Sequence, residues 1–427
     1  MKKALVIGSG AGGATVAKEL QGKFAVTVLE AGKEFSPFSM DLSSVDKIKK
    51  TGLMFDEREI QLLFPSMKIR KTADRMVMVN GIGLGGTTTL ATGNAVRMDE
   101  DVKKCGINLD KEFEELFKEI PISTDHQKRW RPTTRRLFEI CRSMDYHPQP
   151  LPKMGYNSKC INCGRCVLGC AYGAKWDSRN FLQLAQEHGA CVLKKCRVEK
   201  IIFKNGKAIG VKARRGWRTE IHQADLIVLA AGGFGTPVIL ENSGIECEKR
   251  LFVDPVLCVA AEWKNSFQNK EISMPFVVQR NGYILSPYFD YLSFFFNKGW
   301  KFPANDTLGM MIKIADSNIG AVSKRAIDKI LTEADKERLK EGVNDCRLIL
   351  SHLGVNDDQI FLGTINAGHP GGMVPITKDD ADTLHPHRLP DNLYIADATL
   401  FPASLGNPPI LTIMAMAKRV SKVCSQS

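Results

Sequence analysis

The stretch from Ala4 to Gly32 constrains the fold of this chain most strongly. The four apolar residues from Ala4 to Ile7 have the pattern of a buried parallel strand, and the glycines that follow are spaced G-x-G-x-x-G. In a Rossmann unit such glycines allow a tight turn, let the backbone approach a pyrophosphate and pack a helix against a strand. The glycines of this motif are Gly8, Gly10 and Gly13.

A second apolar run, from Ala25 to Leu29, ends at the acidic residue Glu30. Glu30 follows Gly13 by 17 residues, close to the place where a dinucleotide-binding fold keeps an acid for a ribose hydroxyl. A chance match of the glycine spacing is the weaker interpretation, because both the strand and the acid stand where the fold requires them. We therefore expect an α/β fold with a Rossmann-like domain, and these residues leave FAD and NAD both open.

The composition is typical of a soluble globular protein: of 427 residues, 44% are hydrophobic and 25% charged. We expect no transmembrane segment, since no uninterrupted apolar run reaches about 18 residues. We do not expect the N-terminal apolar run to be a secretion signal, because glycines break it and Lys18 and Glu19 follow it. We expect a cytoplasmic enzyme.

The chain is basic, with 59 Lys and Arg against 47 Asp and Glu, a formal net charge of +12. A positive surface favours an anionic substrate or an acidic electron carrier. The basic residues are dispersed in short groups such as Arg214-Arg215, so nucleic acid is the weaker alternative and we expect no nucleic-acid partner.

A second glycine-rich stretch, residues 81–89, has too many glycines for a helix or a central strand. Its flanks, residues 76–79 and 90–96, are apolar, which favours a loop held inside the protein over a flexible surface loop. A backbone held there can donate N–H groups to a second face of the cofactor. A short helix is expected before it, near residues 45–50.

Four cysteines within eleven residues have the spacing C-x2-C-x2-C-x3-C, and they are Cys160, Cys163, Cys166 and Cys170. This is the ferredoxin-like run that ligates a [4Fe-4S] cluster. Zinc or vestigial cysteines are the alternative, although zinc motifs usually use two separated pairs. Ala171 replaces the usual proline, and the last cysteine of such a run serves the other cluster in two-cluster ferredoxins. Cys170 is the natural fourth ligand here, with Cys191, Cys196 and Cys258 as remote alternatives.

The periodicity of the remaining chain predicts alternating strands and helices. The expected strands are residues 191–203, 208–213, 226–231 and 392–397, with a hairpin turn at Asn205-Gly206. The expected helices are residues 181–189, a helix from near Pro237, residues 323–353 and residues 410–423. Residues 250–360 contain strand-like, aromatic-rich pieces, including Phe294 to Phe296. These aromatic residues are more often core than substrate wall.

His369 lies in a glycine-dense turn, Asn366-Ala367-Gly368-His369-Pro370-Gly371-Gly372. A histidine between glycines and before a proline has little packing reason to be there, which favours catalysis over a structural turn.

Taken together, these stretches resemble the glucose-methanol-choline (GMC) oxidoreductases, FAD enzymes that oxidise alcohols. The resemblance covers the flavin domain, about half of the chain, and is closest to the cholesterol oxidase and long-chain alcohol oxidase branches. There a histidine in His-Pro-x-Gly-Gly and an asparagine in Asn-Pro face the flavin, and these positions are His369 and Asn407 here. The resemblance implies non-covalent FAD held by Gly8, Gly10, Gly13, Glu30, Gly85, Gly86, Thr87, Asn94, Val198, Ala231, Gly232, Asp397, Ala398 and Asn407.

Three departures from the family pattern matter. The asparagine usually found shortly after the Gly-Gly pair is Ala91 here, with Asn94 three residues later. The chain is short for the family, which implies a reduced substrate domain. The cysteine run is not a general family feature, and a cluster exchanges single electrons, which an oxidase does not need. We therefore expect a dehydrogenase or reductase coupled to an acidic carrier such as ferredoxin, in an oxygen-poor cell.

The predicted architecture is a GMC-type FAD-binding domain (1–100, 190–250 and 361–427), a helical segment with the iron-sulfur motif (101–189) and a smaller α+β substrate or cap domain (251–360). In the predicted reaction, His369 accepts the hydroxyl proton of an alcohol, the alcohol carbon gives a hydride to flavin N5, and Asn407 positions the oxygen. Reduction of a carbonyl is the reverse reaction. The alternative is an electron-transfer subunit of a larger complex. An oligomer is compatible with the sequence.

Overall fold

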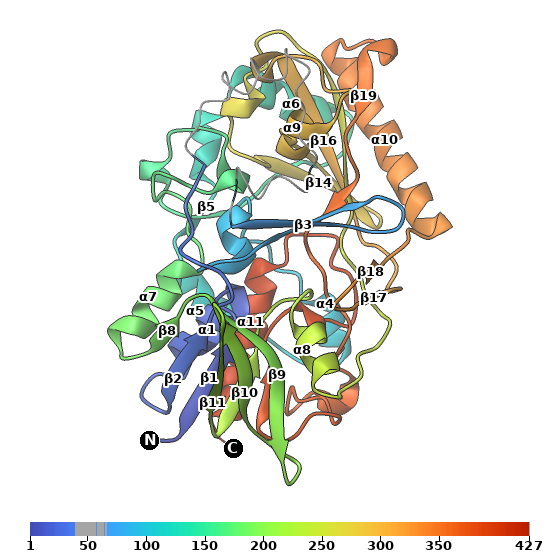
Figure 1. The fold of residues 1–427 in the computed structure, drawn as a ribbon. Coiled ribbons are helices and arrows are strands. Elements are labelled where there is room, and N and C mark those ends of the chain that lie inside the picture. Colours follow the sequence, from blue (N-terminus) through green and yellow to red (C-terminus); the bar gives the residue numbers. More distant parts are fainter. Residues whose placement is uncertain (39–56, 58–63, 65, 427) are drawn as a thin grey trace.

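The computed structural model describes residues 1–38, 57, 64 and 66–426, and two halves built on separate sheets make up these residues (Figure 1). Both chain ends lie in the half that holds β1 and β2, and the other half holds β14 and β16 (Figure 1). The helix expected near residues 45–50 lies outside the described residues.

A five-stranded parallel sheet forms the centre of the first half, in the order β21-β12-β1-β2-β8. Its strands are β1 (Lys3–Ile7), β2 (Ala25–Leu29), β8 (Cys191–Leu193), β12 (Leu226–Leu229) and β21 (Leu393–Ile395). Strands β1, β12 and β21 are almost entirely buried, which is why they read as continuous apolar runs. The structure confirms the mixed α/β fold.

Helices α1, α5, α7 and α11 pack together in this half (Figure 1). Their bounds are α1 (Ala11–Glu19), α5 (Asp110–Glu119), α7 (Arg179–Glu187) and α11 (Ile410–Cys424). The buried Lys418 of α11 joins three of them, since its ammonium donates to Glu19 of α1 and to Glu115 and Glu119 of α5. No helix among the described residues is both long and apolar enough to cross a membrane.

An antiparallel sheet of β9 (Cys196–Lys204), β10 (Lys207–Arg215) and β11 (Arg218–Gln223) lies beside the parallel sheet, with α8 (Thr236–Asn242) against β9. Asn205 and Gly206, both with positive φ, form the expected hairpin turn. The single strand predicted for residues 191–203 is wrong: Lys195, with φ +56°, divides it into β8 and β9. Its amide bonds to Gly32 instead of continuing a ladder.

The second half contains a nine-stranded sheet, in the order β3-β4-β20-β13-β16-β15-β14-β6 with β19 paired to β13. Its strands are β3 (Met67–Lys71), β4 (Val77–Gly81), β6 (Gln149–Pro150), β13 (Val256–Glu262), β14 (Phe276–Arg280), β15 (Tyr283–Pro287), β16 (Thr307–Ile314), β19 (Ile360–Leu362) and β20 (Asn366–Ala367). These strands come from all three predicted domains, and the domain boundaries stay a prediction. In Figure 1, β3 crosses the middle of the view, between the two halves.

Helices α6 (Pro132–Ser143), α9 (Tyr291–Phe296) and α10 (Glu333–Leu353) belong to this second half, where α10 packs on α6 and on the sheet. The shorter elements are α4 (Glu100–Lys104), β5 (Ile122–Ser123), β7 (Lys153–Met154), β17 (Ala321–Val322) and β18 (Ile327–Asp328).

Two predictions for this half are wrong. The aromatic run 294–296 belongs to helix α9, because the Asp290 carboxylate caps its start and accepts the amides of Leu292 and Ser293; all three phenylalanines are buried. Helix α10 begins at Glu333 instead of residue 323. A capping box between Thr332 and Asp335 sets that start, and residues 321–328 form the small β17–β18 hairpin.

Candidate functional site

The first glycine turn, after β1, leaves no room for side chains at two of its positions. A Cβ on Gly8 would lie 2.3 Å from the Ala230 carbonyl oxygen, and one on Gly13 would lie 2.0 Å from the Gly8 oxygen. Gly10, in contrast, has no heavy atom nearer than 3.9 Å to such a Cβ. The first turn of α1 carries no acidic side chain, so its amides suit an anion such as a pyrophosphate.

Glu30 lies buried at the end of β2. Its Oε2 accepts the amide (3.1 Å) and the hydroxyl (2.6 Å) of Ser9, and its Oε1 accepts the amide of Gly32 (2.8 Å). Burial raises the pKa of this carboxyl group against these hydrogen bonds. An ionised carboxylate offers about four acceptor positions, so one remains on Oε1 for a ligand hydroxyl.

The second glycine turn packs against the first, as an internal loop should. Gly85 and Gly86 both have positive φ, and the Gly85 amide donates to the Ser9 hydroxyl at 3.2 Å. A Cβ on Gly86 would lie 2.9 Å from the Gly10 Cα. The 3-10 helix η2 (Gly86–Leu90) follows, and the Thr87 hydroxyl accepts the Gly81 amide. The prediction of an internal loop is confirmed.

Asp397, after β21, ties together two other predicted cofactor contacts. Its Oδ2 accepts the Gly232 amide (2.9 Å) and the Thr236 hydroxyl, and its Oδ1 accepts the amide and hydroxyl of Thr399. These bonds join the turn after β12, which includes Ala231, to the segment that begins with Ala398. Val198 is buried in β9. The assignment of these residues to FAD stays a prediction.

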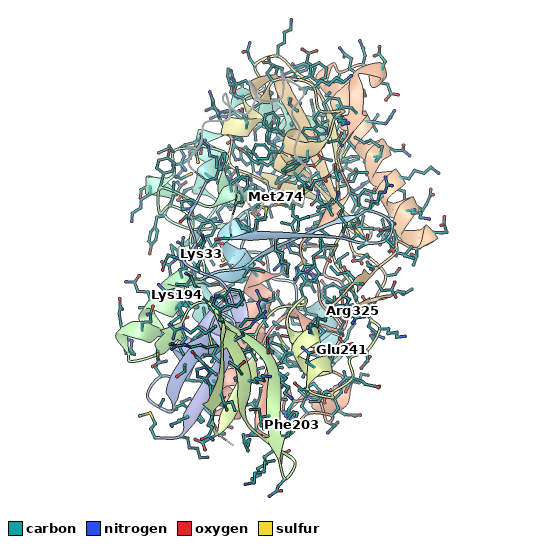
Figure 2. All side chains as sticks on the ribbon, in the orientation of Figure 1. Lys33, Lys194, Phe203, Glu241, Met274 and Arg325 are labelled. Carbon is teal, nitrogen blue, oxygen red and sulfur yellow. The ribbon has the colours of Figure 1, made fainter. Side chains whose placement is uncertain are left out.

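A cavity of about 190 Å³ lies where the two halves meet. Ile410 of α11 lines it from the first half, and Met67 of β3 and Met274 line it from the second. Thr87 and Asn94, which follow the second glycine turn, line it as well. Figure 2 labels Met274 near the level of β3. His369, next to β20, lines the same cavity. The structure therefore brings His369 together with the residues after the second glycine turn.

The His369 imidazole is held by a carboxylate: its Nδ1 lies 3.2 Å from Oδ2 of Asp254. Burial lowers the pKa of His369 and the charge of Lys313 lowers it further, while Asp254 opposes both. A neutral imidazole that donates Nδ1–H to Asp254 keeps Nε2 free as a proton acceptor. The side chain is 30% exposed, which leaves it accessible to a ligand.

Asp254 and Lys313 are site residues that the sequence reasoning missed. Asp254 is buried, accepts the Ser404 hydroxyl and lies 3.0 Å from the Lys313 ammonium. Burial raises the pKa of Asp254, but Lys313, His369 and Ser404 together lower it to about 2. Lys313 interrupts the apolar run of β16, and a charged residue inside such a run is the signal from which a buried partner could have been predicted.

The two predicted asparagines differ in position. Asn94 lines the cavity, and its Oδ1 accepts from the buried Lys153 ammonium. Asn407 is buried, and its amide oxygen accepts a hydrogen bond from the Gln279 amide at 3.1 Å. Among the described residues, its neighbour Pro408 lines the cavity but Asn407 does not. The catalytic role of Asn407 stays a prediction.

All four motif cysteines, Cys170 included, line a second, smaller cavity of about 60 Å³. Among the described residues, no three of their sulfur atoms lie within 4.8 Å of one another. A tetrahedral zinc ion with Zn–S bonds of about 2.3 Å would hold its sulfurs about 3.8 Å apart. The assignment of these four cysteines to a [4Fe-4S] cluster stays a prediction.

Two lysine ammoniums lie near this cavity. Lys175 donates to the carbonyls of Thr88, Thr89, Ala91 and Cys166. Lys153 donates to Asn94 and to the Ser273 carbonyl, and both lysines line the cysteine cavity. Buried positive charge suits a group with several thiolate ligands.

One other group of possible metal ligands occurs among the described residues: Cys196, Glu220 and His222, on the antiparallel sheet. Its histidine pairs with the glutamate at 3.2 Å. It contains none of the four motif cysteines, and Cys196 takes no part in their cavity.

Comparison with known proteins decides the family. Residues 3–258, more than half of the chain, match the model of the GMC oxidoreductase family. The chain belongs to this family. It is 28% identical to an uncharacterized protein of Methanocaldococcus jannaschii over 97% of both chains. It is 23% identical to a long-chain-alcohol oxidase of Arabidopsis thaliana, over 98% of this chain and 66% of that protein. The crystal structure of pyridoxine 4-oxidase from Mesorbium loti shares the fold, with a TM-score of 0.72, 15% identity and 99% coverage of both chains.

Proposed function

We propose that this GMC oxidoreductase is an FAD-dependent enzyme that oxidises the CH–OH group of an alcohol, or reduces the corresponding carbonyl. We further propose that it exchanges electrons through a [4Fe-4S] cluster with an acidic carrier. The observation that carries the proposal is the His369–Asp254 pair at the cavity between the halves. The alcohol oxidase among its relatives supports the same class of substrate.

The residues around the first glycine turn fit the ADP part of FAD. The open backbone at Gly10 and the uncapped start of α1 suit the pyrophosphate, and the remaining acceptor position of Glu30 suits a ribose hydroxyl. When bound, FAD would supply hydride chemistry at this site. Thr87, Asn94 and Pro408 line the cavity from the side of the glycine turns.

The protein's own contribution is the proton. His369 Nε2 takes the hydroxyl proton of the alcohol, or returns it to the carbonyl oxygen in the reverse direction. Asp254 keeps the ring in the tautomer that leaves Nε2 unprotonated, and it stabilises the imidazolium that forms. The apolar side chains of Met67 and Met274 limit water at the cavity.

The four thiolates of the cysteine motif would hold the cluster, and the ammoniums of Lys153 and Lys175 would offset its negative charge. A cluster exchanges single electrons with a protein partner, which favours a dehydrogenase or reductase over an oxidase. The net charge of +12 favours an acidic carrier such as ferredoxin.

Anaerobic flavin bleaching tests the reaction. FAD-loaded protein is mixed with a panel of alcohols, polyols and sterols, and the absorbance of the oxidised flavin is followed. At least one alcohol should bleach it. His369→Ala should slow bleaching about 10²- to 10⁴-fold per bound flavin, the usual contribution of a positioned acid or base. An equal rate in this variant at normal FAD content would remove His369 from the mechanism.

Iron and acid-labile sulfide in anaerobically purified protein test the cluster separately. About four of each per chain are expected, because one [4Fe-4S] cluster contains four of each. Zinc, or protein without metal, would refute this part of the proposal and leave the alcohol chemistry untouched.

A further inference from the structure

Lys313 differs from the other buried lysines of the described structure. Lys329 donates to three backbone carbonyls, Lys418 to three glutamates, and Lys153 to Asn94 and a carbonyl. The Lys313 side chain is only 2% exposed, and apart from the Asp254 carboxylate no described residue accepts a hydrogen bond from its ammonium. Its nearest charged neighbour is Oδ2 of Asp254, at 3.0 Å.

An ammonium has three N–H donors, so a single partner leaves donors of Lys313 without acceptors, and burying such donors is unfavourable. Lys313 also lines the 190 Å³ cavity, as His369 does. Both side chains approach the same oxygen, Asp254 Oδ2, at 3.0 and 3.2 Å. Lys313 Nζ and His369 Nδ1 therefore lie no more than 6.2 Å apart at the edge of the same cavity.

We propose that Lys313 binds the reacting oxygen of the substrate, an inference that rests on the proposed alcohol chemistry. Asp254 and Lys313 together carry no net charge, so a neutral alcohol or carbonyl enters a neutral site. When the O–H bond breaks and the proton moves to His369, the oxygen becomes negative and the imidazole positive. Lys313 then faces the negative oxygen, and Asp254 faces the positive ring.

This assignment gives Lys313 the part that the sequence reserved for Asn407. The amide oxygen of Asn407 accepts from Gln279. Lys313 offers instead a full charge and free donors at the cavity, and hydrogen bonds to charged groups are the stronger ones.

Acetate is a suitable probe of this site. Taken up with one proton, it places a negative oxygen beside a protonated imidazole, the charge distribution expected after proton transfer. The titratable side chains that line the cavity, any of which can share that proton, are Asp254, Tyr288, Asp290, Tyr291, Lys313 and His369. Calorimetric titration of oxidised, FAD-loaded protein with acetate needs no hydride transfer, so it gives a result even if no alcohol bleaches the flavin.

Lys313→Met should weaken acetate binding about 10- to 100-fold, the loss typical of a hydrogen bond to a charged group. With an alcohol that bleaches wild-type flavin, it should lower the limiting reduction rate more than the substrate affinity. Lys418→Met is the control, because it removes a buried ammonium that does not line the cavity. It should leave acetate binding unchanged.

Equal acetate affinity in wild type and Lys313→Met, or no acetate binding in wild type, overturns the inference without touching the role of His369. If Lys313→Met does not fold, wild-type crystals soaked in acetate decide. An acetate oxygen within hydrogen-bond distance of Lys313 Nζ is the expected result, and acetate elsewhere or absent contradicts it.

Discussion

Asp254→Asn is the substitution that tests the candidate active site most directly. The new amide keeps the shape of the carboxylate, and its oxygen still accepts the Ser404 hydroxyl and the Gly406 amide. Its NH₂ group, however, faces His369 Nδ1, where the carboxylate accepted. Nδ1 must then become the acceptor, so the ring proton moves to Nε2, the atom that should take the substrate proton.

The loss can be scaled from the geometry. A unit charge 3.2 Å from the imidazolium is worth about 5 kcal/mol at an effective dielectric constant of about 20. Desolvation and the charge of Lys313 oppose this attraction. For the loss of transition-state stabilisation we therefore use about 1.5–3 kcal/mol, the range typical of hydrogen bonds to charged groups. At about 1.4 kcal/mol per factor of ten, flavin reduction should slow about 10- to 150-fold.

The assay is the rate of substrate-driven flavin reduction per bound flavin between about pH 5 and 9. His369 must be neutral to accept a proton, so the rate rises as pH passes its pKa. Asp254 raises that pKa, so its neutralisation should move the acid limb of the profile to lower pH. Asp335→Asn, at the buried cap of α10, is the matched control and should change stability alone. An unchanged rate together with an unshifted limb would refute the role of Asp254.

Three further predictions concern other parts of the molecule. Cys163→Ser should abolish most of the cluster absorbance and iron content while FAD remains bound, which metal analysis and flavin absorbance check together. Gly13→Ala should yield little folded, flavin-binding protein, because the new Cβ would lie 2.0 Å from the Gly8 oxygen. Gly22, with φ +77°, has open space around it, so Gly22→Ala should lower the free energy of unfolding in urea by only about 1–2 kcal/mol. Burial raises the pKa of Asp290 from 3.8 to about 6. The contribution of its protonated form to stability is therefore complete below pH 4 and is lost as pH rises through 6. Relative to Asp290→Asn, the free energy of unfolding of wild type, measured with urea, should fall by about 3 kcal/mol between pH 4 and 7.

The parts of the fold that the sequence predicted are those that local chemistry decides. Residues 25–29 form β2, and α11 begins at the predicted Ile410. The glycine turns follow from positive φ and close backbone contacts, which only glycine permits. The Asn205-Gly206 turn has one favoured hairpin geometry. In these cases the residue types themselves carry the signal, even where the contact is with a distant residue, as between Gly8 and Ala230.

The failures occur where distant or single side chains decide. Residues 294–296 are apolar in a row, and periodicity cannot separate a short buried strand from a short buried helix. The carboxylate of Asp290 selects the helix by accepting two amides. Likewise, Lys195 ends β8 by bonding to Gly32, a residue far away in the sequence. No pattern within residues 191–203 contains that contact.

The candidate site shows the same division at the level of single atoms. His369 stood out because glycine and proline surround it, but its partner Asp254 lies 115 residues earlier in the chain. Asp254 is held in turn by Lys313 of β16 and by Ser404. A lysine inside a fully buried strand needs either an acceptor or a ligand, because its charge cannot stay unsolvated. The sequence shows a lysine in an apolar strand, which requires a partner for its ammonium. Only the fold shows that this ammonium lies at the cavity beside His369.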